Sequence, residues 1–111
     1  MKPLDEPTVH YVSKKKLFFI EVLAVLDALP NKRLARRYYM DDYGEKHCAI
    51  GAWMRSKGAT TTSEGWDRLG EHPCAHYYFV DVTKANDRVW FGARRRYRKV
   101  RDWLINQIGA L

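Results

Sequence analysis

The spacing of apolar positions predicts two long amphipathic helices, one in each half of the chain. Between residues 14 and 29, apolar side chains recur three and four positions apart, and Ser13 can cap the helix start. Pro30 ends this helix. Its buried stripe is predicted to contain Phe18, Val22, Val25, Leu26 and Leu29. Residues 1–12 include two prolines and are predicted to form an extended lead-in to a single compact domain at residues 13–111.

The second long helix is predicted to begin at Phe91 or Gly92 and to end at Ile108. Its buried stripe comprises Tyr97, Val100, Leu104 and Ile108. Basic and polar residues face outward on this helix: Arg94, Arg95, Arg98, Lys99, Arg101, Asp102 and Asn106.

Three shorter helices are predicted between the two long ones. The first spans residues 48–57 and ends before Gly58, and the second spans residues 64–69 with Thr62 or Ser63 as its cap. Residues 76–82 have strand propensity, but apolar residues at helical spacing around them favour a helix that ends at Asn86–Asp87.

The segment at residues 32–45 has few apolar residues and is harder to assign. A hairpin that pairs residues 34–40 with residues 45–50, turning at Asp42-Tyr43-Gly44, is slightly favoured over a short helix and loop. The predicted fold is therefore mainly α, with two long amphipathic helices packed against shorter helices and a small β-hairpin. The small residues Ala49, Gly51 and Ala52 indicate that another backbone approaches closely at the centre of this fold.

Length and composition fit one globular domain. The chain has 111 residues, of which 46% are hydrophobic, and it contains 4 Trp, 7 Tyr and 4 Phe, enough for a core. It has no run of about 18 uncharged apolar residues, so no transmembrane helix and no membrane partner are predicted. The order of polar and apolar residues does not suit a signal peptide, so we expect a cytoplasmic protein with reduced cysteines.

The basic charge is concentrated near the C-terminus. The formal net charge is +7, and residues 94–101 contain six Lys and Arg without an acid. Such a cluster can bind phosphates or an acidic protein surface, although it can also be a solvated face neutralised by Asp81, Asp87 and Asp102. Lys14–Lys16 could extend the surface. The predicted binding residues are Arg94, Arg95, Arg98, Lys99, Arg101, Trp90, Arg36 and Arg37, with Phe91 as a further exposed aromatic.

Two cysteines offer alternative chemistry. Cys48 at a helix start could be a nucleophile, with His72 or His76 as its base, but its small apolar neighbours favour a core residue. His72, Cys74 and His76 could bind zinc together with His47 or Cys48, but the paired spacing of structural zinc sites is missing. The sequence therefore predicts no catalytic residue, no metal and no cofactor.

Three features of the sequence occur together from Leu17 to Ile108. These are the motif Cys48-Ala49-Ile50-Gly51-Ala52, the pair Asn86-Asp87, and the apolar residues Val100, Trp103, Leu104 and Ile108 of the last helix. In these features the chain resembles an uncharacterised group of small phage and bacterial mobile-element proteins. The resemblance implies a viral or mobile-element accessory protein, a class that often binds host machinery.

The sequence thus leads to three functional hypotheses. The first is a non-enzymatic binding protein in the host cytoplasm that engages a host protein or nucleoprotein complex through its basic C-terminal helix. It could inhibit a defence system in the manner of an anti-CRISPR protein. The alternatives are a DNA- or RNA-binding accessory protein that uses the same surface, and a small cysteine hydrolase that uses Cys48.

Overall fold

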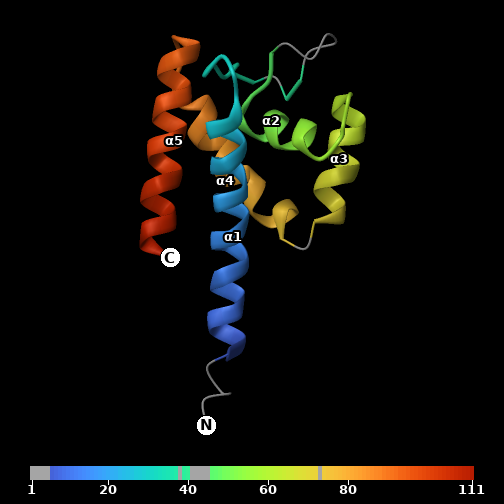
Figure 1. The fold of residues 1–111 in the computed structure, drawn as a ribbon, viewed down its shortest axis with the longest axis vertical. Helices are drawn as coiled ribbons and strands as arrows, with labels where there is room; N and C mark the ends of the chain where they lie inside the picture. Colours follow the sequence, from blue (N-terminus) through green and yellow to red (C-terminus); the bar gives the residue numbers. More distant parts are fainter. Residues whose placement is uncertain (1–5, 38, 41–45, 73) are drawn as a thin grey trace.

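The chain forms a helical bundle in the computed structural model, which describes residues 6–37, 39–40, 46–72 and 74–111. Within these residues there are five helices, shown in Figure 1: α1 (Glu6–Ala28), α2 (Ala49–Ser56), α3 (Thr62–Glu71), α4 (Ala75–Asp87) and α5 (Ala93–Ala110). The prediction of a mainly α fold with two long helices is confirmed, and the long helices are α1 and α5. None of the described helices is both long and apolar enough to cross a membrane.

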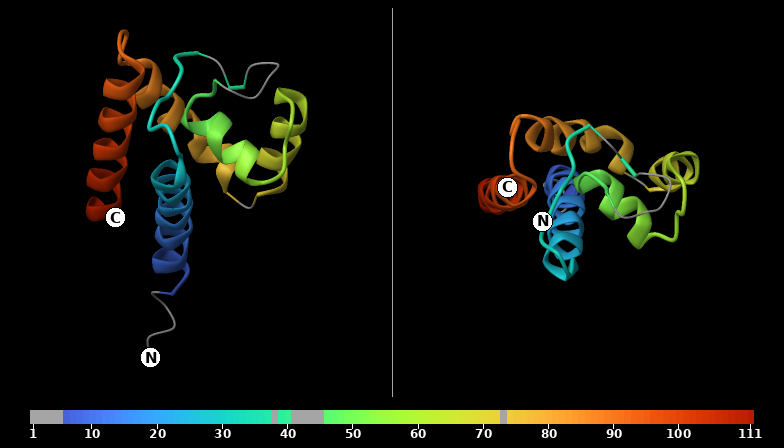
Figure 2. Two further views of the ribbon diagram at one scale, coloured as in Figure 1. Left: turned by 45° about the horizontal axis from the view of Figure 1, so that its top comes forward. Right: turned by 90° about the horizontal axis from the view of Figure 1, so that it is seen from above.

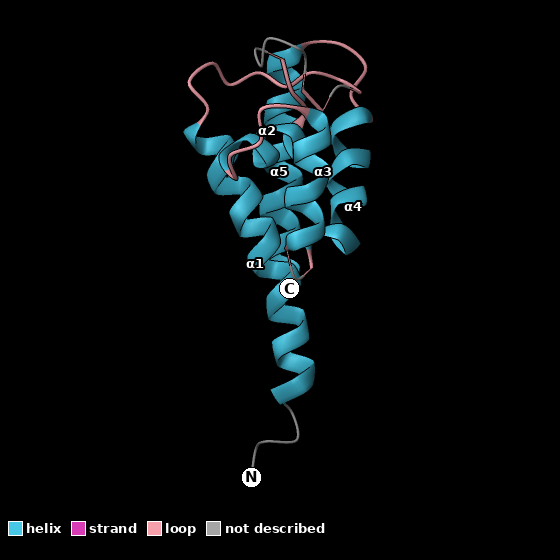
Figure 3. Ribbon diagram, turned by 90° about the vertical axis from the view of Figure 1, so that its right-hand side faces the viewer, coloured by secondary structure: helices cyan, strands magenta, loops and turns pink. Residues whose placement is uncertain are grey.

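Helix α1 is the central element of the bundle. It packs against α5 on one side and against α2 and α4 on the others, while α3 packs against α2 and α4 (Figure 2). Helices α1 and α5 run antiparallel, so the end of α1 and the start of α5 lie at the same end of the molecule (Figure 1). The first turns of α1 project beyond the other helices (Figure 3).

Helix α1 begins eight residues earlier than predicted. It starts at Glu6 rather than Lys14, so the prediction of an extended lead-in is wrong for residues 6–12. Ser13, the predicted cap, lies inside the helix. Pro7 is compatible with this start because it falls in the first helical turn, where a backbone N–H has no helical partner. Residues 1–5 lie outside the described residues.

The core lies between α1 and its neighbours. Phe18, Val22 and Leu26 of α1 are fully buried, as predicted, whereas Leu17 and Ile20 are exposed. The ring of Phe18 meets the indole of Trp53 edge-on, with 5.7 Å between their centroids. Burying such large aromatic rings stabilises the fold strongly. Other fully buried side chains come from the remaining parts of the bundle: Leu34, Ile50, Met54, Val82, Val100 and Leu104.

The start of α2 confirms the predicted close approach of two backbones. A Cβ atom placed on Gly51 would overlap the carbonyl oxygen of Tyr39. Cys48 caps the helix by accepting a hydrogen bond from the Gly51 N–H to its Sγ. The buried Asn86 side chain accepts a second bond from the Ala49 N–H and donates to the Ala35 carbonyl. Asn86 thereby joins α4 to α2 and to the loop after α1.

The predicted hairpin is reduced to one bridge in the described residues. Met40 and His47 form a single antiparallel bridge, and the predicted turn at residues 42–44 lies outside the described residues. The Ala35 N–H donates to the His47 carbonyl, in the predicted second strand, but the Leu34 N–H donates to the Ala93 carbonyl outside the predicted hairpin. The predicted second strand, residues 45–50, cannot form over its full length because α2 begins at Ala49.

The remaining short helices follow the predictions closely. The cap of α3 is Thr61, one residue before the predicted Thr62, and its hydroxyl accepts the Glu64 N–H. Residues 75–87 form helix α4 rather than a strand. Apolar residues recur at helical spacing in this segment, so a helix buries Ala75, Val82 and Ala85 on one side.

Candidate functional site

A groove lined by basic residues lies at the end of the molecule where α1 stops and α5 starts. We call it the basic groove. It has a volume of about 660 Å³ and runs between the loop after α1 and the first half of α5. Its lining residues are Pro30, Asn31, Lys32, Arg33, Arg94, Tyr97, Arg98 and Arg101. Positively charged side chains therefore line both of its walls.

Helical geometry divides the predicted basic face of α5 into two rows. At about 100° per residue, Arg94, Arg98 and Arg101 fall on one side of the helix and line the basic groove. Arg95 and Lys99 point about 100° away from this row and are exposed outside the groove. The structure thus brings together three of the five binding residues predicted on α5 and separates the other two from them.

Arg96, in the middle of the same basic run, is a structural residue. It is only 5% exposed, and burial lowers the pKa of its guanidinium group. Its three nitrogens donate hydrogen bonds to backbone carbonyls of Leu34 (2.7 Å), Val89 (3.0 Å) and Trp90 (3.0 Å). Arg96 therefore ties the loop after α1 to the start of α5 and holds the two walls of the basic groove together.

The groove residues differ in how far their charge is already neutralised. Arg101 pairs with Asp27 at 2.7 Å, and Lys32 donates to the Asp27 carbonyl. Arg33, Arg94 and Arg98 form no ion pair and no side-chain hydrogen bond with any other described residue. The first turn of α5 contains no acid, although a helix start favours negative charge. An anion in the groove would relieve this unfavourable concentration of positive charge.

The loop after α1 is held in a specific conformation. Lys32 and Arg37 have positive φ angles of 51° and 71°, which cost non-glycine residues roughly 1–2 kcal/mol each. Asp87 opposes that cost at Arg37 by accepting its backbone N–H at 3.0 Å. Strain of this kind is often found at binding sites, where it fixes side chains in advance.

A second, smaller groove extends the basic surface toward Trp90. It has a volume of about 320 Å³, and Arg33, Arg36 and Lys46 are among its lining residues. The guanidinium carbon of Arg36 lies 3.6 Å from the centre of the Trp90 ring. Trp90 is 63% exposed and the adjacent Phe91 is 79% exposed. The predicted residues Arg36, Arg37 and Trp90 thus form one cluster, and Arg36 connects it to the basic surface.

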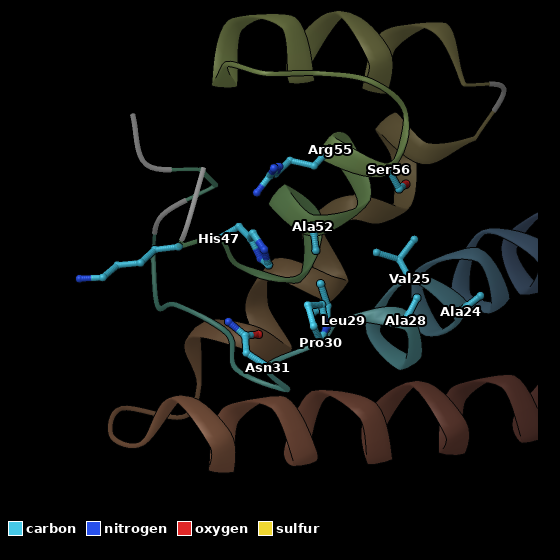
Figure 4. A pocket seen from close by; sticks show the side chains of 11 residues that line it. Ala24, Val25, Ala28, Leu29, Pro30, Asn31, His47, Ala52, Arg55 and Ser56 are labelled. Carbon is cyan, nitrogen blue, oxygen red and sulfur yellow. The ribbon is translucent and has the colours of Figure 1, made fainter. Parts of the chain in front are cut away.

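A third concavity, shown in Figure 4, is mainly apolar, and we call it the apolar pocket. It has a volume of about 950 Å³. One wall is the end of α1 with Pro30, and the other is formed by α2 and the residues before it. Its lining residues are Ala24, Val25, Ala28, Leu29, Pro30, Asn31, Lys46, His47, Ala52, Arg55 and Ser56. It shares Pro30 and Asn31 with the basic groove.

Positive charge predominates in all three concavities. Lys and Arg line each of them, and no Asp or Glu is found among their described lining residues. Lys32, Arg33 and Lys46 were missed by sequence reasoning. Lys32 and Arg33 directly follow the predicted end of the first helix, but only the antiparallel packing of α1 and α5 places them opposite Arg94 and Arg98.

The predicted extension through Lys14–Lys16 is not part of this surface. These residues lie roughly 20 Å along the α1 axis from the helix end that borders the groove, at 1.5 Å per residue. Lys15 instead lies over the rings of Phe19 and Tyr78.

Cys48, Cys74 and His72 make structural contacts. Cys48 is 2% exposed, and burial raises the pKa of its thiol to about 11, so it is protonated at neutral pH. The His72 Nδ1 lies 3.8 Å from the Sγ of Cys74, not of Cys48, and accepts the Ala75 N–H at the start of α4. Within the part of the chain that the structure describes, no group of three or more His, Cys, Asp or Glu could hold a metal ion.

The chain was also compared with known proteins. Comparison with models of protein families, with curated proteins and with solved structures finds no match.

Proposed function

We propose that this chain is a non-enzymatic binding protein whose basic groove holds the phosphate backbone of a nucleic acid. The observation that supports this most strongly is the groove itself, with Lys32 and Arg33 on one wall and Arg94 and Arg98 on the other. Most charged surfaces alternate acids and bases, whereas the described lining of this groove has no acid. Two facing cationic walls suit a linear polyanion.

The side chains fit phosphate in chemistry and in spacing. Arginine presents a planar fork of N–H donors that matches phosphate oxygens. Arg94 and Arg98, which form no ion pair with any described residue, lie about 6 Å apart along the axis of α5, from its rise of 1.5 Å per residue. A row at this spacing can contact neighbouring phosphates of one strand, and contacts of this kind give affinity without sequence specificity.

The resemblance to phage and mobile-element proteins extends this proposal. The nucleic acid would then belong to a host nucleoprotein complex in the cytoplasm, and binding would interfere with that complex, as an inhibitor of a defence system does. An acidic protein surface is the other partner that could occupy a basic groove. The surroundings of Cys48 give no support to the cysteine hydrolase, because a buried, protonated thiol is a poor nucleophile.

The test is a binding titration with a fluorescently labelled single strand and its duplex, at low and at near-physiological salt. We expect micromolar or tighter binding of nucleic acid at low salt. For single strands, three or four phosphate contacts give a slope of roughly −2 to −3 for log K against log salt. Absence of binding to both probes at low salt would contradict the proposal and point to an acidic protein partner.

A further inference from the structure

We infer that the apolar pocket receives an unpaired base of the strand whose phosphates lie in the basic groove, so that the protein selects single-stranded nucleic acid over duplex. This inference rests on the proposed function, which by itself requires only phosphate contacts. It adds an apolar contact with a base to the phosphate contacts, and it adds a preference for single-stranded nucleic acid over duplex.

The two concavities adjoin at a single point of the loop after α1. Pro30 and Asn31 line both of them, and Asn31 also lines the smaller groove near Arg36. A nucleotide has a charged phosphate and a flat, largely apolar base joined by a sugar. A phosphate between Arg33 and Arg94 would therefore place the attached base near the shared boundary with the apolar pocket.

The lining of the apolar pocket suits a base. Leu29, Pro30 and Ala52 offer apolar surface around the pocket, and Ala24 and Ala28 leave space beside it (Figure 4). The Asn31 amide at the boundary has both donors and acceptors, as does the edge of a base. A pocket with apolar walls and a few polar groups is typical of small-ligand sites, and the volume of about 950 Å³ is sufficient.

The requirement for a single strand follows from this geometry. Bases in a duplex are paired and stacked inside the helix, so they cannot enter a side pocket without being extruded, which costs several kcal/mol. The exposed rings of Trp90 and Phe91 support the same conclusion independently. Exposed aromatic rings beside a cationic groove are the usual platform on which single-stranded bases stack.

The experiment compares three labelled probes of equal length: a single strand, its duplex, and a single strand that lacks bases. The abasic strand keeps every phosphate, so it reports the basic groove alone. We expect the natural strand to bind at least about tenfold more tightly than the abasic strand and the duplex, as stacking of one base provides. Equal affinity for the natural and abasic strands would overturn this inference and leave phosphate binding intact.

Three variants locate the base, one of them a control. Ala28→Phe fills the apolar pocket from an exposed position on α1, and Ala110→Phe makes the same change at an exposed position at the end of α5. We expect Ala28→Phe to lower affinity for the natural strand severalfold, toward that for the abasic strand, and Ala110→Phe to change neither affinity. If Ala28→Phe leaves the ratio of affinities for the natural and abasic strands unchanged, the base does not enter this pocket. Asn31→Ala, an exposed loop variant, should weaken natural-strand binding in the same way, and circular dichroism checks that each variant is folded.

Discussion

Neighbouring arginines in this protein have opposite roles. Arg95 is exposed outside the groove, whereas Arg96 is buried and bonds to the carbonyls of Leu34, Val89 and Trp90. In the sequence both belong to one basic run, and composition cannot distinguish them. Their positions on α5 differ by about 100°, and this rotation turns Arg96 toward the loop after α1.

We predict that Arg96→Met lowers the free energy of unfolding by about 2–4 kcal/mol, because three carbonyl groups lose charged hydrogen-bond donors. Arg95→Met is the matched control and should change it by less than about 0.5 kcal/mol. Urea denaturation followed by circular dichroism measures both. Similar stability of the two variants would show that Arg96 does not hold the loop.

At the level of elements, the bundle depends on the close approach of α2 to the backbone of Tyr39. Gly51 lies at the contact, and a Cβ there would overlap the Tyr39 carbonyl oxygen. Because backbone atoms on both sides are fixed by α2 and by the bridge between Met40 and His47, the overlap cannot be relieved by turning a side chain.

We therefore predict that Gly51→Ala lowers the free energy of unfolding by about 3 kcal/mol or more, at the upper end of what overpacking costs. Gly70→Ala is the control, since Gly70 lies in α3 with nothing within 4 Å of a new Cβ. It should raise stability by up to about 1 kcal/mol through helix propensity. Thermal denaturation distinguishes the variants, and a stable Gly51→Ala protein would refute the close contact.

The helices could be predicted from the sequence because their signals are local. The periodicity of Phe18, Val22 and Leu26 and the caps near Thr61 and Gly58 depend on residues within a few positions of one another. The loop at residues 29–37 could not be predicted in this way. Its course is set by bonds to Ala93, Asp87 and Arg96, which lie roughly fifty to sixty residues away in sequence.

At the scale of the whole molecule, the fold gathers charges that the sequence scatters. The sequence identified Arg94, Arg98, Arg101 and Arg36, but it also grouped Arg95 and Lys99 with them. It missed Lys32 and Arg33, because their place opposite α5 depends on the antiparallel packing of α1 and α5, and it missed Lys46, which lines the smaller groove and the apolar pocket. A local basic run therefore predicted a basic surface, and the packing of the helices decides which of its residues line the groove.

Two double variants separate the basic groove from the general positive charge of the protein: Arg94→Glu with Arg98→Glu in the basic groove, and Arg95→Glu with Lys99→Glu on the other row of α5. Both change the net charge of the protein equally, so any difference between them reports the position of the charges. The measurement is the affinity for a labelled single strand at low salt. We predict that the groove variant loses roughly 100-fold or more in affinity and shows a shallower salt slope, while the outer variant loses less than about tenfold. Equal losses in the two variants would contradict the account, because they would show that binding depends on net charge and not on the groove.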